Sequence, residues 1–293
     1  MNAISQKPLA LTMGDPAGIG PEIVAKALAH DAILRDRVVV VGDPLVFADA
    51  LTRYAPTFRA LAVDPRQPLP ELHEHDIALY PVRSVSSLPP LGRVTAEAGQ
   101  AAYSAIIAAA ELSLEGHTCG MATAPINKLA LRAASVAEPG HTEILARIAG
   151  LAGTDRFAMM LASEHLQVVL ATIHLSLAKA LEALTPELVL QKIQLTHEAG
   201  RWLGKSKPRI AIAGINPHAG EGGMLGDDEQ RVLVPAIAAA RAQGISVTDP
   251  LPPDTVFMRA RAGKFDVVLA MYHDQGLIPV KLLGLDRDRK SVV

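Results

Sequence analysis

The 293-residue sequence has only one cysteine, almost no net charge and no long apolar run. The single Cys119 excludes an intramolecular disulfide and fits a reducing compartment, so we expect a cytoplasmic protein. The 28 basic residues nearly balance the 30 acidic ones, which argues against a nucleic-acid-binding surface. No apolar segment approaches the roughly 20 residues that span a bilayer, and the first apolar run is too short for a signal sequence, so we expect no membrane association.

The residues that are present indicate a globular α/β protein. Nearly half of them (49%) are apolar, and short runs rich in β-branched residues alternate with longer helix-like stretches. This alternation is typical of α/β folds with a mostly parallel sheet. The expected strands cover 9–13, 38–41, 77–80, 120–123, 166–173, 209–215 and 265–272. The expected helices cover 21–30, 95–114, 142–149, 185–203 and 227–243.

Two α/β domains are expected, one over 1–124 and the other over 125–293, with the second carrying most of the candidate site. The helix expected over 95–114 is rich in alanine. Its small side chains would let it pack closely against a neighbouring element or a second subunit.

Three expected strands end near a histidine. "LATIHLSL" leads to His174, "AGINPHAG" leads to His218 and "AMYHDQG" leads to His273. Because the carboxyl ends of parallel strands share one edge of a sheet, we expect the three imidazoles on the same rim. Three histidines that leave a coordination position open form a catalytic type of metal site. Each histidine taken alone is more often an ordinary hydrogen-bonded loop or core residue.

Two aspartates are candidates for proton transfer. Asp274 follows His273 directly and could orient an imidazole, accept a proton, bind substrate or cap the next turn. Asp254 lies in "PPDTVF", a rigid loop that could be functional or only a turn. Sequence alone does not decide between these roles.

Two further motifs are candidate anion sites. The loop "TMGDPAGIGPE" matches neither a P-loop nor the G-x-G-x-x-G pattern, so it is either a tight turn or a helix start that binds an anion. In "GHTE", His141 and Thr142 stand at a helix start, where Thr142 could be the N-cap and the free amides could bind phosphate. Lys281 could pair with the same phosphate or be a solvated surface lysine.

Together these segments resemble the 4-hydroxythreonine-4-phosphate dehydrogenase family of vitamin B6 biosynthesis. The matching stretches, in order along the chain, are "LTMGDPAGIGPEI", "TAPINK", "GHTE", "ATIHLSL", "INPHAGEGG", "PPDTVF" and "AMYHDQGLIPVK". The resemblance implies two α/β/α domains related to isocitrate and isopropylmalate dehydrogenases. It also implies a homodimer whose active site lies in a cleft near the subunit interface, with metal ligands from both chains.

The resemblance also assigns roles to residues. It implies that His174, His218 and His273 bind a divalent metal, with zinc as the first choice and magnesium or cobalt as alternatives. His141 and Thr142 would contact the substrate and Lys281 its phosphate, while the cofactor would be NAD or NADP. The implied reaction oxidises the secondary alcohol of 4-phosphohydroxy-L-threonine, with Asp254 or Asp274 as the base, and decarboxylation gives 3-amino-2-oxopropyl phosphate. Relatives within the family act instead on threonate or erythronate phosphates.

The sequence departs from the family after Gly284. It reads "LDRDRKSVV", so Lys290 occupies the position where a substrate-binding asparagine is expected, and the later phosphate-binding arginine has no counterpart. We therefore expect weak or absent activity for this chain. Two other functions stay open at this stage, a zinc hydrolase with three histidines that activate water and an inactive remnant that still binds metal.

Overall fold

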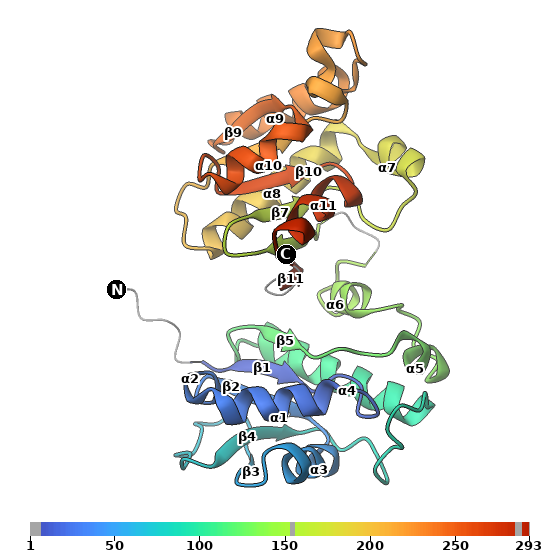
Figure 1. Ribbon diagram of the computed structural model, residues 1–293, viewed down its shortest axis with the longest axis vertical. Helices are drawn as coiled ribbons and strands as arrows, with labels where there is room; N and C mark the ends of the chain where they lie inside the picture. Colours follow the sequence, from blue (N-terminus) through green and yellow to red (C-terminus); the bar gives the residue numbers. More distant parts are fainter. Residues whose placement is uncertain (1–6, 153–155, 285–288, 293) are drawn as a thin grey trace. The chain divides into compact units, whose positions relative to one another are not determined.

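The computed structural model describes residues 7–152, 156–284 and 289–292 (Figure 1). By its internal contacts the chain divides into two compact units, Met1–Ala152 and Gly153–Val293. Each unit has one β-sheet with helices on both faces, so the predicted α/β class is confirmed.

The first unit is built on a parallel five-stranded sheet. The strands in sheet order are β3 (Arg59–Ala62), β4 (Asp76–Pro81), β2 (Val38–Gly42), β1 (Leu9–Thr12) and β5 (Met121–Thr123). Helices α1 (Gly20–His30) and α3 (Pro44–Tyr54) cover one face, and the short α2 (Ala32–Arg35) follows α1. Helix α4 (Ala96–Leu114) covers the other face, where its alanines pack on β1 and β2.

The alanine-rich α4 also packs closely on α5 (Lys128–Ala133). A Cβ atom on Gly99 would lie 2.0 Å from the Ala130 carbonyl oxygen, so only glycine fits at this crossing. Helix α6 (His141–Ile148) contacts α4 as well. Because α5 and α6 pack on α4, the chain divides between Ala152 and Gly153, whereas the sequence placed the boundary near residue 124.

The second unit is built on a mixed six-stranded sheet. The strands in sheet order are β11 (Arg289–Val292), β6 (Met159–Ala162), β7 (Gln167–Leu170), β10 (Val267–Ala270), β8 (Ile210–Ala213) and β9 (Val247–Leu251). The four strands from β7 to β9 are parallel, while β6 and β11 run in antiparallel pairs at one edge. The parallel strands thus bring the three predicted strand ends to neighbouring positions.

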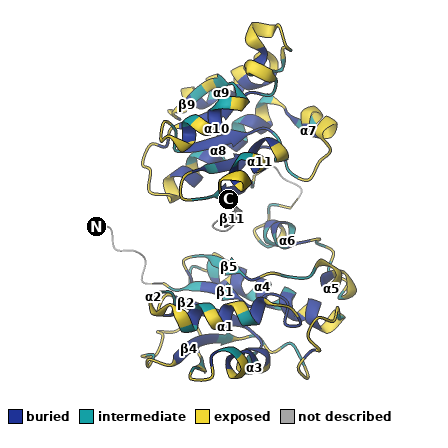
Figure 2. Cartoon of the chain, in the orientation of Figure 1, coloured by how far each residue is buried: buried dark blue, intermediate teal, exposed yellow. Residues whose placement is uncertain are grey.

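Successive residues of each strand face opposite layers of helices. Val267 and Leu269 of β10 pack toward α8 (Pro186–Trp202), the π-helical turn η2 (Glu229–Leu233) and α9 (Val234–Ala242). Val268 and Ala270 pack toward α10 (Pro253–Arg261) and α11 (His273–Gly284). Helix α7 (Leu177–Ala183) follows β7. Burial on both faces explains why these strands read as continuous apolar runs (Figure 2).

At the carboxyl terminus, β11 pairs with β6 and places Lys290 opposite Leu161. Residues 285–288, where the departure from the family begins, lie outside the described part of the chain. In the described ranges, no helix combines the length and apolarity that crossing a bilayer requires.

Candidate active site

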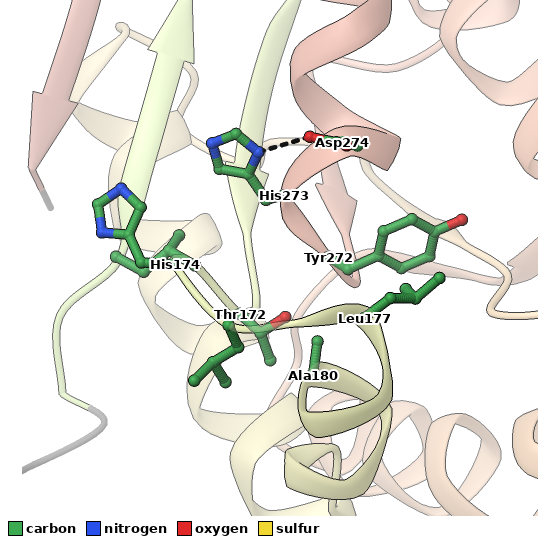
Figure 3. Close-up of a pocket in the computed structure, with 9 residues that line it drawn as sticks. Thr172, His174, Leu177, Ala180, Tyr272, His273 and Asp274 are labelled. Atoms are coloured by element: carbon green, nitrogen blue, oxygen red, sulfur yellow. Dashed lines mark hydrogen bonds and ion pairs between the residues drawn. The ribbon is translucent and has the colours of Figure 1, made fainter.

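His174 and His273 lie together at the carboxyl edge of the second sheet. Strands β7 and β10 pair in parallel register, with Leu170 opposite Ala270, and the chain reaches a histidine a few residues after each. The two ring centroids are 6.0 Å apart. Both rings line a pocket of about 220 Å³, whose other walls include Thr172, Leu177 and Tyr272 (Figure 3).

Asp274 fixes the orientation of the His273 ring. Its Oδ1 lies 2.7 Å from His273 Nδ1, on the side of the ring that faces away from His174 in Figure 3. These neighbours can bond because they begin helix α11, where successive side chains do not point in opposite directions as they do in a strand. Since Nδ1 is occupied, Nε2 is the nitrogen left for a ligand, which is the usual arrangement of a metal-binding imidazole.

His218 occupies a different kind of segment. It follows β8 in η1 (Pro217–Gly223), a tight turn whose residues from His218 to Gly222 all have left-handed backbone. Within 7–152, 156–284 and 289–292 of one chain, no three His, Cys, Asp or Glu side chains are grouped so that they could hold a metal. One chain therefore brings His174 and His273 together, and the complete set of three histidines stays a prediction.

Two of the three candidate histidines have unfavourable backbone. His174 and His218 both have φ 52°, in the left-handed region that costs a residue with a side chain about 1–2 kcal/mol. Residues in this conformation concentrate at functional sites, where the surrounding structure holds them in place. The backbone at both positions is thus consistent with a functional role.

The two candidate catalytic aspartates line a second hollow, of about 520 Å³, between α10 and α11. Asp254 lies in the first turn of α10, directly after Pro252 and Pro253, and is exposed. Asp274 lines this hollow as well as the histidine pocket. Lys281 is exposed further along α11.

His141 and Thr142 lie in the first unit, at the start of α6. The N-cap is Gly140, and no side chain caps the helix, so Thr142 lies in the first turn instead of at the cap. Thr142 is 3% exposed, while His141 is half-buried. The first amides of a helix that no side chain caps favour an anion.

Lys128 is a further cation at this helix start that the sequence reasoning did not single out. Its Cε would lie 3.8 Å from a Cβ on Gly140, and Glu143 Oε2 would lie 3.6 Å from the same point. Asn127 begins α5 by accepting hydrogen bonds from the amides of Leu129 and Ala130, and so fixes the base of the Lys128 side chain. The signal was present in "TAPINK", where an N-cap asparagine directly precedes the lysine.

The glycine loop after β1 packs tightly against the segment after β5. A Cβ on Gly14 would lie 2.2 Å from the Pro125 carbonyl oxygen, and that oxygen accepts a hydrogen bond of 2.9 Å from the Asp15 amide. Gly20 similarly abuts the Met13 carbonyl oxygen. Burial raises the pKa of the Asp15 carboxyl above its ordinary value, although a hydrogen bond from the Ala17 amide opposes this shift. These glycines thus have a packing role, as expected for a tight turn.

Comparison with known proteins identifies the family. Residues 35–290 match the family described as pyridoxal phosphate biosynthetic protein PdxA. The chain is 52% identical over 284 residues to 4-hydroxythreonine-4-phosphate dehydrogenase of Beijerinckia indica, which covers 96% of this chain and 82% of that protein. It is 42% identical over 291 residues to D-threonate 4-phosphate dehydrogenase of Salmonella typhimurium. This match covers 95% of this chain and 84% of that protein.

A solved structure agrees with these sequence relatives. The crystal structure of 4-hydroxythreonine-4-phosphate dehydrogenase from Klebsiella pneumoniae superposes with a TM-score of 0.87 at 43% identity, covering 97% of this chain and 87% of that one. The fold and these relatives together define an α/β oxidoreductase built from two sandwich units. The chain belongs to the PdxA family of pyridoxal phosphate biosynthetic proteins.

Proposed function

We propose that this protein is a metal-dependent NAD(P) dehydrogenase of 4-phosphohydroxy-L-threonine. The secondary alcohol would lose its carbon-bound hydrogen as hydride to NAD or NADP and its hydroxyl proton to a base. The resulting β-keto acid would then lose carbon dioxide and give 3-amino-2-oxopropyl phosphate. The name of the Beijerinckia relative, at 52% identity, supports this substrate, and we place the reaction in the cytoplasm.

The observation that carries the proposal is the His174 and His273 pair beside Asp274 in one pocket. Two imidazoles at this spacing, one of them oriented by a carboxylate, fit two ligands of a divalent cation such as zinc, with magnesium or cobalt as alternatives. His218 would be the third ligand, supplied by a second copy of the chain. A bound cation would stabilise the negative charge that develops on the alcohol oxygen as it is oxidised.

Asp254 is the better candidate for the base. Asp274 Oδ1 is engaged by His273 Nδ1, so this carboxylate is committed to orienting the ring. Asp254 is exposed at the start of α10 and lines the same hollow as Asp274. A carboxylate with that access can take the hydroxyl proton as the hydride leaves.

We assign the phosphate to cations and to the amides of a helix start. The start of α6 offers backbone N–H groups without a side-chain cap, together with His141, Thr142 and the nearby Lys128. Lys281 on α11 is a further candidate phosphate contact. Helix starts and lysines both bind phosphate through charge-assisted hydrogen bonds.

We further propose that the enzyme is a homodimer. Helices α10 and α11 expose large apolar side chains around the 520 Å³ hollow, with Met258 65% and Leu282 81% exposed. Such a patch at the hollow that holds Asp254 and Asp274 fits a subunit interface beside the active site. It would also explain how His218 reaches the site from a second chain.

A second candidate substrate is a 4-phosphorylated hydroxy acid without the amino group, such as threonate or erythronate phosphate. The D-threonate 4-phosphate dehydrogenase of Salmonella typhimurium is 42% identical over 95% of this chain. Both substrates have the same alcohol, carboxylate and phosphate, so the histidine pocket and the α6 start would serve either one. The substituent at C2 alone distinguishes them.

The test is a turnover assay with the purified chain. The departure after Gly284 predicts a low rate. At whatever rate it occurs, reduced nicotinamide should form only when a divalent metal, NAD or NADP and a phosphorylated substrate are all present. The two substrates are assayed in parallel, and the larger kcat/KM identifies the physiological one. Release of inorganic phosphate without any reduced nicotinamide would contradict the proposal and favour a hydrolase.

A further inference from the structure

The three strand ends that precede the histidines are joined by buried side-chain hydrogen bonds. Thr172 Oγ1, after β7, donates to the Met271 carbonyl oxygen after β10, at 2.8 Å. The Met271 amide donates to Gln275 Oε1 at 2.7 Å, and Gln275 Nε2 donates to the Gly214 carbonyl oxygen after β8, at 2.6 Å. Gln275 is 8% exposed, so these bonds form away from bulk water.

Glu229 continues the connection toward His218. Its carboxylate accepts hydrogen bonds from the amides of Ile215 and Asn216, at 2.8 and 2.7 Å, and from Asn216 Nδ2 at 3.0 Å. Glu229 is 3% exposed. Three consecutive residues after β8, from Gly214 to Asn216, are therefore held through their main chain by two buried side chains, and His218 follows two residues later.

The connection depends on a side chain that both donates and accepts. Where parallel strands separate at the edge of a sheet, their last N–H and C=O groups lose their ladder partners and need others when buried. A glutamine amide supplies one acceptor for Met271 and one donor for Gly214, so it can bridge two strands in a way that a carboxylate or an apolar group cannot. Gly276 lets α11 approach, since a Cβ there would lie 2.5 Å from Leu170 Cδ2.

We propose that Gln275 is a positioning residue that sets the place of His174 and His273, which would bind the same cation, and of the His218 segment, which would serve the cation site of a second copy. It touches no reacting atom in this assignment; it acts through the main chain of β10 and β8, two residues from His273. The inference rests on the proposed function, because it presupposes that the histidines bind a metal. A metal site needs its ligands held within a few tenths of an ångström, and groups behind the ligands supply that precision.

A matched control in the same sheet distinguishes the positioning role of Gln275 from a purely structural one. Gln167, in β7, donates through Nε2 to the Ser163 carbonyl oxygen at 2.7 Å, at the opposite end of that strand from His174. Gln275→Met and Gln167→Met each remove an amide of similar size from a hydrogen bond to a carbonyl. Both should lower the melting temperature, whereas only Gln275→Met should affect the histidine ends of the strands.

The experiment is a cobalt(II) titration of the full chain, followed by visible absorption and paired with thermal unfolding. We expect Gln275→Met to weaken cobalt binding about 10- to 100-fold and to alter the spectrum, while Gln167→Met binds as the wild type does. Gln275→Glu, which keeps the acceptor for Met271 and loses the donor to Gly214, should fall between the two. This variant also covers the case in which Gln275→Met does not fold.

Two results would overturn the proposal. Wild-type cobalt affinity and spectrum in a folded Gln275 variant would show that the bridge does not position the ligands. Equal weakening by Gln167→Met would show that any loss of stability has the same effect. A wild-type chain that binds no cobalt at all would instead remove the metal from the proposed function, and the positioning role would fall with it.

Discussion

Single residues of the same type have different surroundings in this site. Asp274 bonds to His273 Nδ1, whereas Asp254 is exposed in the first turn of α10, although both line one hollow. The sequence identified both aspartates and left their roles open. The structure distinguishes them because the backbone turns into a helix at His273, a geometry that the letters "YHDQG" do not specify.

This difference predicts that the two asparagine substitutions affect different quantities, one the metal affinity and the other kcat. Asp274→Asn removes the carboxylate that orients His273 and should lower metal affinity about 10- to 100-fold. Asp254→Asn removes the proposed base and should lower kcat about 10²- to 10⁴-fold while metal affinity stays unchanged. Metal titration and steady-state kinetics on both variants measure the two effects, and an exchange of the two phenotypes would reverse the assignment.

At the scale of whole elements, burial decides which strands and helices could be predicted from the sequence. The strands expected near 38–41, 209–215 and 265–272 correspond to β2, β8 and β10, because burial on both faces leaves an unbroken apolar run. The edge strands β3 and β9 were not foreseen, since β3 is only partly buried and β9 contains Pro250. Helix α11 was also not foreseen, because Pro279 lies within it.

The candidate site was also predicted only in part. Parallel strand order predicted that His174, His218 and His273 share one rim, and the adjacent β7 and β10 bring the rings of His174 and His273 within 6.0 Å of each other. Gln275 and Glu229 could not be found in this way, because their partners are main-chain groups that lie far away in the sequence. Sequence patterns specify which face a residue takes, and they do not specify which distant carbonyl group it meets.

An ion pair joins β8 and β10 at their amino ends, on the side of the sheet opposite the histidines. Arg209 donates to both carboxylate oxygens of Asp266, through Nε at 2.9 Å and through one terminal nitrogen at 3.0 Å, where β8 and β10 begin. The Arg209 hydrogen bonds lower the pKa of the Asp266 carboxyl below its ordinary value, against a smaller opposing effect of burial. The ionised form therefore contributes stability above the ordinary aspartate pKa of about 4.

This pKa shift predicts a pH-dependent cost for Asp266→Asn. The substitution should lower the free energy of unfolding at pH 7. The difference from the wild type should shrink as pH falls below about 4, where the unfolded carboxyl takes up a proton first, and it should be lost once the pH passes the lower pKa of the folded carboxyl. Urea denaturation at a series of pH values measures the difference. A difference that does not change with pH would mean that the charge of Asp266 contributes nothing.

At the scale of the whole molecule, the proposed metal site takes its ligands from two chains. The start of α6 belongs to the first unit, whereas the histidines and both aspartates belong to the second. Within the described residues, one chain assembles no metal site of three side chains. In the proposed function, a second chain supplies His218 as the third ligand.

The proposed dimer predicts that a charge on α11 separates the subunits. Leu282→Glu introduces a carboxylate at a side chain that is 81% exposed in the single chain and would be buried in the dimer. Trp202→Glu, on α8 at 70% exposure, is the matched control on another face. Sedimentation equilibrium should show monomers only for Leu282→Glu, with loss of activity, and an unchanged dimer in both variants would locate the interface elsewhere.

The most direct measurement is anomalous diffraction from crystals of the full chain grown with zinc. The account predicts one strong peak within about 2.0–2.1 Å of imidazole nitrogens from His174 and His273, with His218 of a second copy as the third ligand. A peak bound by other residues, or imidazoles that remain apart with zinc present, would contradict it.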